Sequence, residues 1–233
     1  MNLLKRIKQF FQKDDLLRLT FISDTHCDES ADLGSGDILF HSGDLSWRGT
    51  SKEIKRQLDW LSKQEFKHKV IICGNHEVNV ELGRTPMKRY CEERGITWLQ
   101  DSSIELLGLK IHGSPRTVEF CGWAYMHEDE DLKHFWDKIP EDTDVLLTHG
   151  PPKGILDKTR RTEYHVGSET LRDRVNELNL KVHSFGHIHE AHGTLKQNGT
   201  LYINAAIMTR DYMPYNPPTK VIYTCGTMIL EEE

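Results

Sequence analysis

The chain contains few cysteines, and they form no regular framework. Five cysteines are spread over 233 residues, without a Cys-x-x-Cys pair. An odd number of widely spaced cysteines is typical of free thiols in a reducing compartment, not of a disulfide scaffold. We therefore expect a cytoplasmic protein.

Long apolar runs are also absent. No stretch approaches the length of a membrane span, and the first thirteen residues lack the apolar core and cleavage site of a signal peptide. Residues 1–15 instead form a basic amphipathic segment, whose apolar residues at helical spacing are Leu3, Leu4, Ile7, Phe10 and Phe11. Two interpretations stay open: a helix on an anionic membrane surface, or a docked or frayed terminus. The second is favoured, because so short a helix binds lipid weakly.

Positive charge is not in excess, since the formal net charge is −6. Extensive nucleic-acid binding needs a basic face and is therefore not expected, although bound metal ions can invert the field of an acidic site.

Internal repeats and low-complexity linkers are missing as well. The simplest organisation is one domain over residues 16–233. The sequence does not indicate the oligomeric state.

Apolar runs of strand length recur along the chain and predict a buried sheet. They occupy residues 16–23, 37–43, 68–74, 144–150 and 181–187. Helical patterns lie between them at 50–61, where Thr50 and Glu53 are spaced as a capping box, and at 168–178. The last forty residues are rich in strand patterns separated by Gly, Asn and Pro. This order predicts an α/β fold with helices outside the sheet structure.

Potential metal ligands follow each of these five strands, and several are flanked by glycine. In strand order they are Asp24 and His26, Asp44, Asn75 and His76, His149, and finally His187 and His189. Because sites in α/β sheets form at the carboxyl ends of strands, we expect them to share one crevice. Any single triplet of this kind is more often structural than functional. Five ligand-rich strand ends together predict a metal site.

The ligand types indicate two divalent ions. Carboxylates, an amide oxygen and imidazoles suit Mn, Fe, Zn, Co or Ni, and the sequence does not choose among these. Asp24 and His26, like His187 and His189, lie two residues apart, which puts them on one side of an extended chain. Asp44 has two oxygens that can bridge two ions, a clamp suited to phosphoryl displacement. His76 can stabilise or protonate the departing oxygen.

These motifs resemble the calcineurin-like metallophosphoesterase superfamily from about residue 16 to residue 224. The resemblance implies a four-layer α-β-β-α sandwich of two mixed β-sheets flanked by helices. It implies that one metal is held by Asp24, His26, Asp44 and His189. It implies that the other is held by Asp44, Asn75, His149 and His187. His76 would be the residue nearest the leaving group, and Asp44 and His76 are the expected catalytic residues.

Smaller motifs narrow the resemblance to the metallophosphoesterase-domain-containing branch, which is close to class III cyclic-nucleotide-phosphodiesterase-like proteins. These motifs include residues 112–115, 148–157, 185–193 and 202–206. The implied function is hydrolysis of a small nucleotide-like or organic phosphodiester by a metal-bridging hydroxide. The alternatives are a phosphomonoesterase or nuclease with the same metals, and a non-catalytic metal- or nucleotide-binding scaffold. Known scaffolds have typically lost ligands, and here every ligand position is filled.

Residues 43–49 also resemble an element of the protein serine/threonine phosphatases, with Arg48 at the arginine position. Trp47 replaces the expected aspartate and Cys73 replaces an expected arginine, which weakens that interpretation. Arg48, His112 and Arg116 are candidate substrate contacts. His41 is either a residue that orients a ligand or an ordinary strand residue. Two further histidines are candidates with no assigned role: His165 and His192.

Overall fold

The computed structural model describes residues 16–159 and 164–231, and the N-terminal segment 1–15 lies outside this range. Two six-stranded sheets form its centre. The first has the order β14 (Thr227–Leu230), β13 (Thr219–Thr224), β1 (Leu16–Ile22), β2 (Ser35–Ser42), β3 (Glu65–Ile72) and β4 (Thr97–Trp98). The second has the order β11 (Gly193–Gln197), β12 (Thr200–Asn204), β10 (Val182–Phe185), β9 (Val145–Thr148), β6 (Leu109–Ser114) and β5 (Ser102–Leu106).

Both sheets are mixed, because parallel central strands are continued by antiparallel strands at the edges. β1, β2, β3 and β4 are parallel, whereas β13 and β14 are antiparallel to their neighbours. In the second sheet β6, β9, β10 and β12 are parallel, whereas β5 and β11 are antiparallel to their neighbours. The short strands β7 (Thr117–Val118) and β8 (Met126–His127) form a separate pair.

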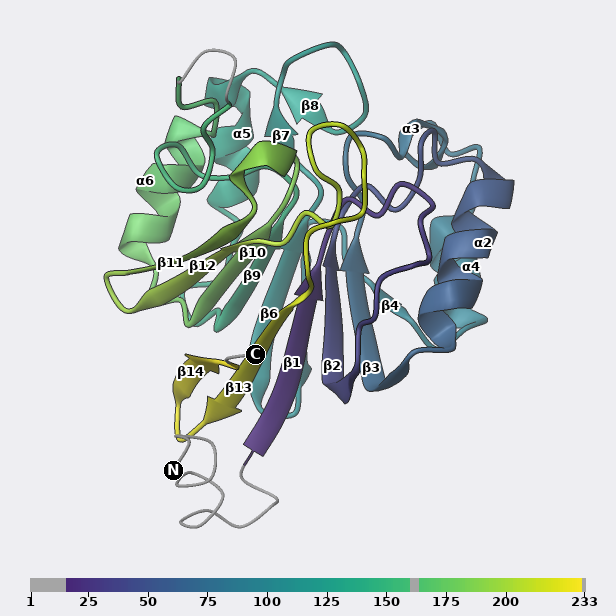
Figure 1. The fold of residues 1–233 in the computed structure, drawn as a ribbon. Coiled ribbons are helices and arrows are strands. Elements are labelled where there is room, and N and C mark those ends of the chain that lie inside the picture. Colours follow the sequence, from purple (N-terminus) through teal and green to yellow (C-terminus); the bar gives the residue numbers. More distant parts are fainter. Residues whose placement is uncertain (1–15, 160–163, 232–233) are drawn as a thin grey trace.

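Helices cover the outer face of each sheet, as Figure 1 shows. α2 (Ser51–Ser62), α3 (Val78–Glu81) and α4 (Met87–Glu92) lie on the side of the first sheet, and α5 (Asp129–Trp136) and α6 (Glu169–Glu177) lie on the side of the second. This arrangement confirms the predicted four-layer sandwich. None of the helices in the described part of the chain is long and apolar enough to cross a membrane.

Three apolar clusters match these layers, because successive residues of a strand point to opposite faces. Phe40 of β2 stacks on Phe21 of β1 in the cluster between the sheets. Its neighbour Leu39 joins the cluster beneath α2, with Leu58. A third cluster lies beneath α5 and α6. Burial on both faces explains why these strands are nearly continuous apolar runs.

The expected capping box of α2 is present. The Thr50 side chain accepts from the backbone N–H of Glu53, and the Glu53 side chain accepts from the backbone N–H of Thr50. The sequence did not predict the β5–β6 hairpin or α5. β5 is largely exposed and polar, and α5 buries only Leu132 and Trp136, so neither carries a long periodic signal.

Candidate metal centre

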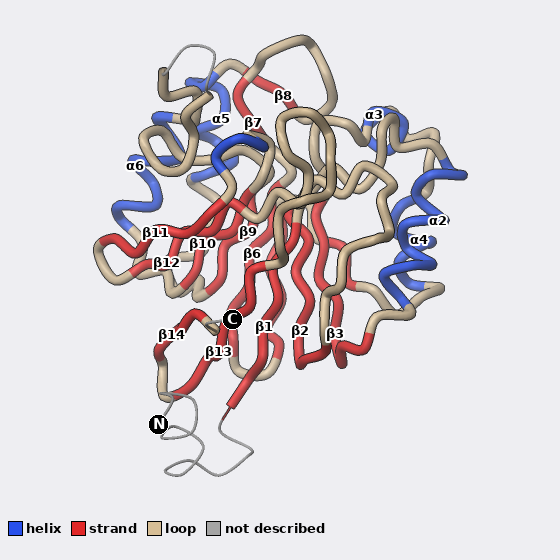
Figure 2. The backbone as a smooth tube through the Cα atoms, in the orientation of Figure 1, coloured by secondary structure: helices blue, strands red, loops and turns tan. Residues whose placement is uncertain are grey.

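The carboxyl ends of the parallel strands from both sheets lie at the same end of the molecule, because residues that follow them contact one another across the sheets. Loops gather at this end (Figure 2). Every predicted metal ligand lies at this end, immediately after β1, β2, β3, β9 or β10. We call these ligands together with His76 the floor of the site. Its residues are Asp24, His26, Asp44, Asn75, His76, His149, His187 and His189.

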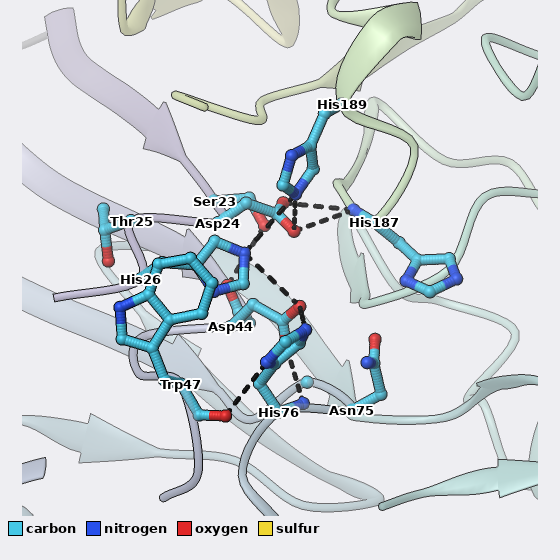
Figure 3. A network of polar contacts seen from close by, with 12 residues as sticks. Ser23, Asp24, Thr25, His26, Asp44, Trp47, Asn75, His76, His187 and His189 are labelled. Atoms are coloured by element: carbon cyan, nitrogen blue, oxygen red, sulfur yellow. Dashed lines mark hydrogen bonds and ion pairs between the residues drawn. The ribbon is translucent and has the colours of Figure 1, made fainter. Parts of the chain in front are cut away.

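The first group of ligand atoms comes from Asp24, His26 and His189, whose ligand atoms all lie within 4.8 Å of one another. His189 Nε2 lies 3.2 Å from Asp24 Oδ1 and 3.4 Å from His26 Nε2. These residues come from opposite sheets, since His189 follows β10 of the second. Figure 3 shows the three side chains pointing toward one another.

The second group comes from Asp44, His149 and His187, with the same 4.8 Å limit. His149 Nε2 lies 2.8 Å from Asn75 Oδ1 and 3.4 Å from Asp44 Oδ2. Asp44 Oδ2 is also 3.8 Å from His26 Nε2, which belongs to the first group. Asp44 therefore lies between the two groups, as a bridging carboxylate must.

Backbone carbonyls fix the orientation of four floor histidines. Nδ1 of His26 lies 3.3 Å from Ser46 O, and Nδ1 of His149 lies 3.0 Å from Ser42 O. His76 and His189 make the same kind of contact, to Trp47 O at 3.0 Å and Thr209 O at 3.1 Å. A carbonyl accepts only from a protonated Nδ1, so in each neutral ring Nε2 keeps its lone pair facing the centre. For His26, His149 and His189 this is the arrangement of metal-binding imidazoles, whereas His76 would need a second proton, on Nε2, to donate to a leaving oxygen.

Glycines allow the ligand loops to approach one another closely. A Cβ on Gly186 would lie 1.9 Å from Asp24 Oδ2, and one on Gly74 would lie 2.4 Å from Asp44 Oδ1. Any larger residue at either position would displace a carboxylate of the floor. The glycine that precedes His187 and the glycine that precedes Asn75 are therefore explained by space, not by backbone strain.

The floor keeps its carboxylates charged, but it lowers the pKa of some of its imidazoles and raises the pKa of others. Burial lowers the pKa of His26 to about 4 and the pKa of His187 to about 3. Burial alone would raise the pKa of Asp24, but the hydrogen bond and charge of His189 hold it below its usual value. Burial would likewise lower the pKa of His149, yet the Asp44 carboxylate raises it to about 9. A cation at this position would replace that proton.

Glu77 supports the floor from below, a role that the sequence did not reveal. Its buried carboxylate accepts from the backbone N–H groups of Asp44, Ser46 and Gly74 at 2.7–3.0 Å, and from Ser46 Oγ at 2.8 Å. Burial and the Asp44 carboxylate raise the pKa of Glu77 to about 8, while hydrogen bonds from Gly74 and Ser46 oppose that rise. The available signal was an acidic residue directly after the Gly74–His76 motif.

The predicted extended geometry of the ligand pairs is wrong. Asp24 and His26 have positive φ values of 53° and 44°, and His187 has a φ of 67°. These residues lie in tight turns after the strands, and His189 begins the short 3₁₀ helix η2 (His189–Ala191). The turns send His187 and His189 to different groups, a division that an extended chain would not produce.

A cavity of about 750 Å³ opens above the floor. Asp44, Asn75, His76, His187 and His189 line its base. Its walls are largely apolar, and we call four aromatic wall residues the rim of the site. The rim consists of Trp47, Phe120, Trp123 and Tyr212. The sequence placed the loop of residues 114–131 at the pocket but did not single out these four rings, because loop aromatics carry no periodic pattern.

The candidate substrate contacts separate into two sets. Arg48 lines the cavity, and its guanidinium lies 4.7 Å from the centre of the Trp123 ring. His112 and Arg116 are not among the described residues that line it. His112 is buried on β6 with Nδ1 2.8 Å from Ser103 Oγ, and Arg116 pairs with Asp101 at 2.9 Å.

The remaining histidines lie away from the cavity wall. His41 is buried on β2, where Nε2 lies 3.0 Å from Thr25 Oγ1 and Nδ1 accepts from the backbone N–H of Gly43. His41 thus contacts Thr25 and Gly43, which are sequence neighbours of ligands, and forms no hydrogen bond with a ligand side chain. His165 lies 2.5 Å from the Asp157 carboxylate. His165 and His192 border a different pocket.

Comparison with known proteins identifies a matching family model and several relatives. A family model described as calcineurin-like phosphoesterase matches residues 17–191. The human metallophosphoesterase domain-containing protein 1 is 32% identical, over 86% of this chain and 69% of its own length. A UPF0046 protein of Caenorhabditis elegans is 31% identical, over 86% of this chain and 76% of its own.

Two solved structures share the fold. TT1561 of Thermus thermophilus aligns with a TM-score of 0.61 and 11% identity, covering 93% of this chain and 98% of its own. A dimetal phosphatase from Danio rerio aligns with a TM-score of 0.52 and 9% identity, covering 92% of this chain and 95% of its own. At these identities the likeness concerns the fold alone.

Proposed function

The chain belongs to the calcineurin-like phosphoesterase family, and from that premise we propose that it is a dinuclear metal-dependent phosphodiesterase. Its substrate is a small nucleotide-like or organic phosphodiester. The observation that carries the proposal is the convergence of two ligand groups around Asp44 at the base of one cavity. A cavity of about 750 Å³ accommodates a molecule of nucleotide size.

The residues of the floor fit two divalent cations. One ion would be held by Asp24, His26, Asp44 and His189. The other would be held by Asp44, Asn75, His149 and His187. The chemistry that such a pair supplies is activation of a water for attack on phosphorus and neutralisation of phosphate charge. Mn²⁺ is one suitable ion among several, because the ligand set accepts most borderline divalent metals.

His76 would act on the leaving oxygen, and its position in the cavity supports this role. It lines the cavity, and its Nε2 lies 3.9 Å from Asp44 Oδ2 at the centre of the floor. Its Nδ1 is directed to Trp47 O, so the ring is held in one orientation (Figure 3). Arg48 is the one Lys or Arg among the described cavity-lining residues and can meet a phosphate oxygen from the wall.

The alternatives are less well supported. A nuclease needs a basic groove, yet Glu119 lines the cavity with Arg48, and the net charge is −6. A phosphomonoesterase must hold a dianion, for which the described part of the wall offers a single arginine. A scaffold without activity is opposed by the complete set of ligands.

The free state of all five cysteines supports a cytoplasmic location.

The test is hydrolysis of bis(p-nitrophenyl) phosphate by metal-stripped protein that is titrated with Mn²⁺. Asp44→Asn removes the charge between the two groups, and Asp59→Asn, at a side chain that is 53% exposed, is the matched control. We expect turnover that depends on metal, is weak with p-nitrophenyl phosphate, and disappears in Asp44→Asn only. Two bound metals per chain without turnover of either ester would refute a general phosphodiesterase.

A further inference from the structure

One wall of the cavity is formed by Trp47 and Tyr212, whose rings contact histidines of the first ligand group. The Trp47 and Tyr212 rings lie 5.1 Å apart, and both contact the His26 ring, at 4.7 and 5.2 Å. Tyr212 also contacts His189 at 5.0 Å. Despite these contacts, Trp47 remains 40% exposed and Tyr212 44% exposed, so part of each ring faces the cavity.

The loop that carries Tyr212 is connected to the floor. The backbone N–H of Tyr212 donates to Thr209 O, the same carbonyl that Nδ1 of His189 contacts. The backbone N–H of Thr209 in turn donates to Met213 O. Trp47 lies on the loop after β2, and its own carbonyl orients His76. Both rings are therefore held in place before any substrate arrives.

A second aromatic wall residue, Trp123, lies against His76. The Trp123 ring lies 4.4 Å from the His76 ring, closer than the 6.0 Å that separates Trp47 from His76. Under the proposed function, His76 serves the leaving oxygen, so the leaving arm of a diester lies beside Trp123. The other arm, which stays on phosphorus, is then left to the wall of Trp47 and Tyr212, whose rings contact His26.

We propose that Trp47 and Tyr212 are specificity-determining residues that select diesters whose retained arm carries a planar aromatic group. This inference rests on the proposed phosphodiesterase function. A flat group can pack against fixed, half-exposed rings without ordering new side chains, and it covers apolar surface that otherwise contacts water. A nucleobase belongs to this class of groups, and so does a phenyl ring.

The test compares two substrates that share the leaving group p-nitrophenolate and differ in the retained arm, p-nitrophenyl phenyl phosphate and p-nitrophenyl methyl phosphate. The quantity is the ratio of kcat/KM for phenyl over methyl, measured in the Mn²⁺-loaded protein and in Trp47→Leu and Tyr212→Leu. Tyr215→Leu is the matched control, because Tyr215 lies in the same loop, is 72% exposed and does not line the cavity. Intrinsic reactivity cancels when the ratio is compared between proteins.

We expect the ratio to fall by about 5–50-fold in each of the two variants and to stay unchanged in Tyr215→Leu. Trp123→Leu, on the leaving side, should lower both rates and change the ratio less than twofold. An unchanged ratio in Trp47→Leu and Tyr212→Leu, with both diesters still hydrolysed, would overturn this inference and leave the phosphodiesterase intact. No hydrolysis of either diester by the loaded protein would overturn both.

Discussion

The floor of the site buries polar side chains, whereas its rim exposes aromatic ones. Asp24 and His149 are fully buried, while Phe120 is 81% exposed and Tyr212 is 44% exposed. Each region reverses the distribution that a folded chain usually adopts. The floor tolerates the reversal because its polar atoms are paired with one another and with backbone groups. The rim tolerates it because exposed rings cost little stability, which leaves them available for binding.

This comparison implies that substitutions in the floor affect chemistry and folding, and that substitutions in the rim affect recognition. The largest expected effect is the loss of kcat in the variant His76→Ala. The role proposed for His76 includes that of a general acid, whose loss lowers kcat by about 10²–10⁴-fold. The loss should be greater for a phenol leaving group than for p-nitrophenol, which departs without protonation. Kinetics on the two aryl esters measure it, with the exposed His134→Ala as control. Equal losses on both esters would contradict proton donation.

The next effect is on folding. Glu77→Ala leaves the backbone N–H groups of Asp44, Ser46 and Gly74 without their buried acceptor. We expect the free energy of unfolding to fall by about 3–5 kcal/mol, measured by urea denaturation. Glu93→Ala, at a side chain that is 52% exposed, should change it by less than about 0.5 kcal/mol. Similar values for the two variants would show that the floor does not depend on Glu77.

His112, a buried histidine outside the floor, should make the free energy of unfolding depend on pH through its burial. Burial lowers the pKa of His112 to about 4, below the value near 6.5 of an unfolded chain. As the pH falls below about 6.5, the unfolded state binds a proton that the folded state refuses, so stability is lost until about pH 4. Between pH 7 and pH 5 the wild type should lose about 2 kcal/mol more than His112→Asn, by urea denaturation. Parallel pH profiles would contradict a neutral, buried His112.

The smallest expected effect is at the rim. Phe120→Ala should change the free energy of unfolding by less than about 0.5 kcal/mol, because its ring is 81% exposed. Phe40→Ala, which removes a fully buried ring between the sheets, should cost about 3–5 kcal/mol. Thermal or urea unfolding of both variants provides the comparison. A large loss for Phe120→Ala would mean that the rim is part of the core and not a binding surface.

The sequence by itself determined the layers and the members of the floor. Continuous apolar strands, capped amphipathic helices and glycine-flanked Asp, Asn and His residues are local patterns. They predicted an α/β fold with outer helices and the end of it that carries the ligands, whereas the resemblance implied the two packed sheets. The hairpin of β5 and β6 and helix α5 were not predictable in this way, because β5 and α5 are short and largely polar on the surface. Their structure depends on packing against β9 and α6.

Only the tertiary structure decided the geometry of the site. Asp24 and His187 lie in turns with positive φ that bring ligands from two sheets together. The Glu77 carboxylate accepts from backbone N–H groups of another loop, and Trp47 meets Tyr212, so both contacts join residues far apart in the sequence. Local propensity does not encode such contacts, because they form only when two sheets bring their strand ends together. The chemistry of the floor therefore follows from residue types, whereas its orientation and its rim follow from packing.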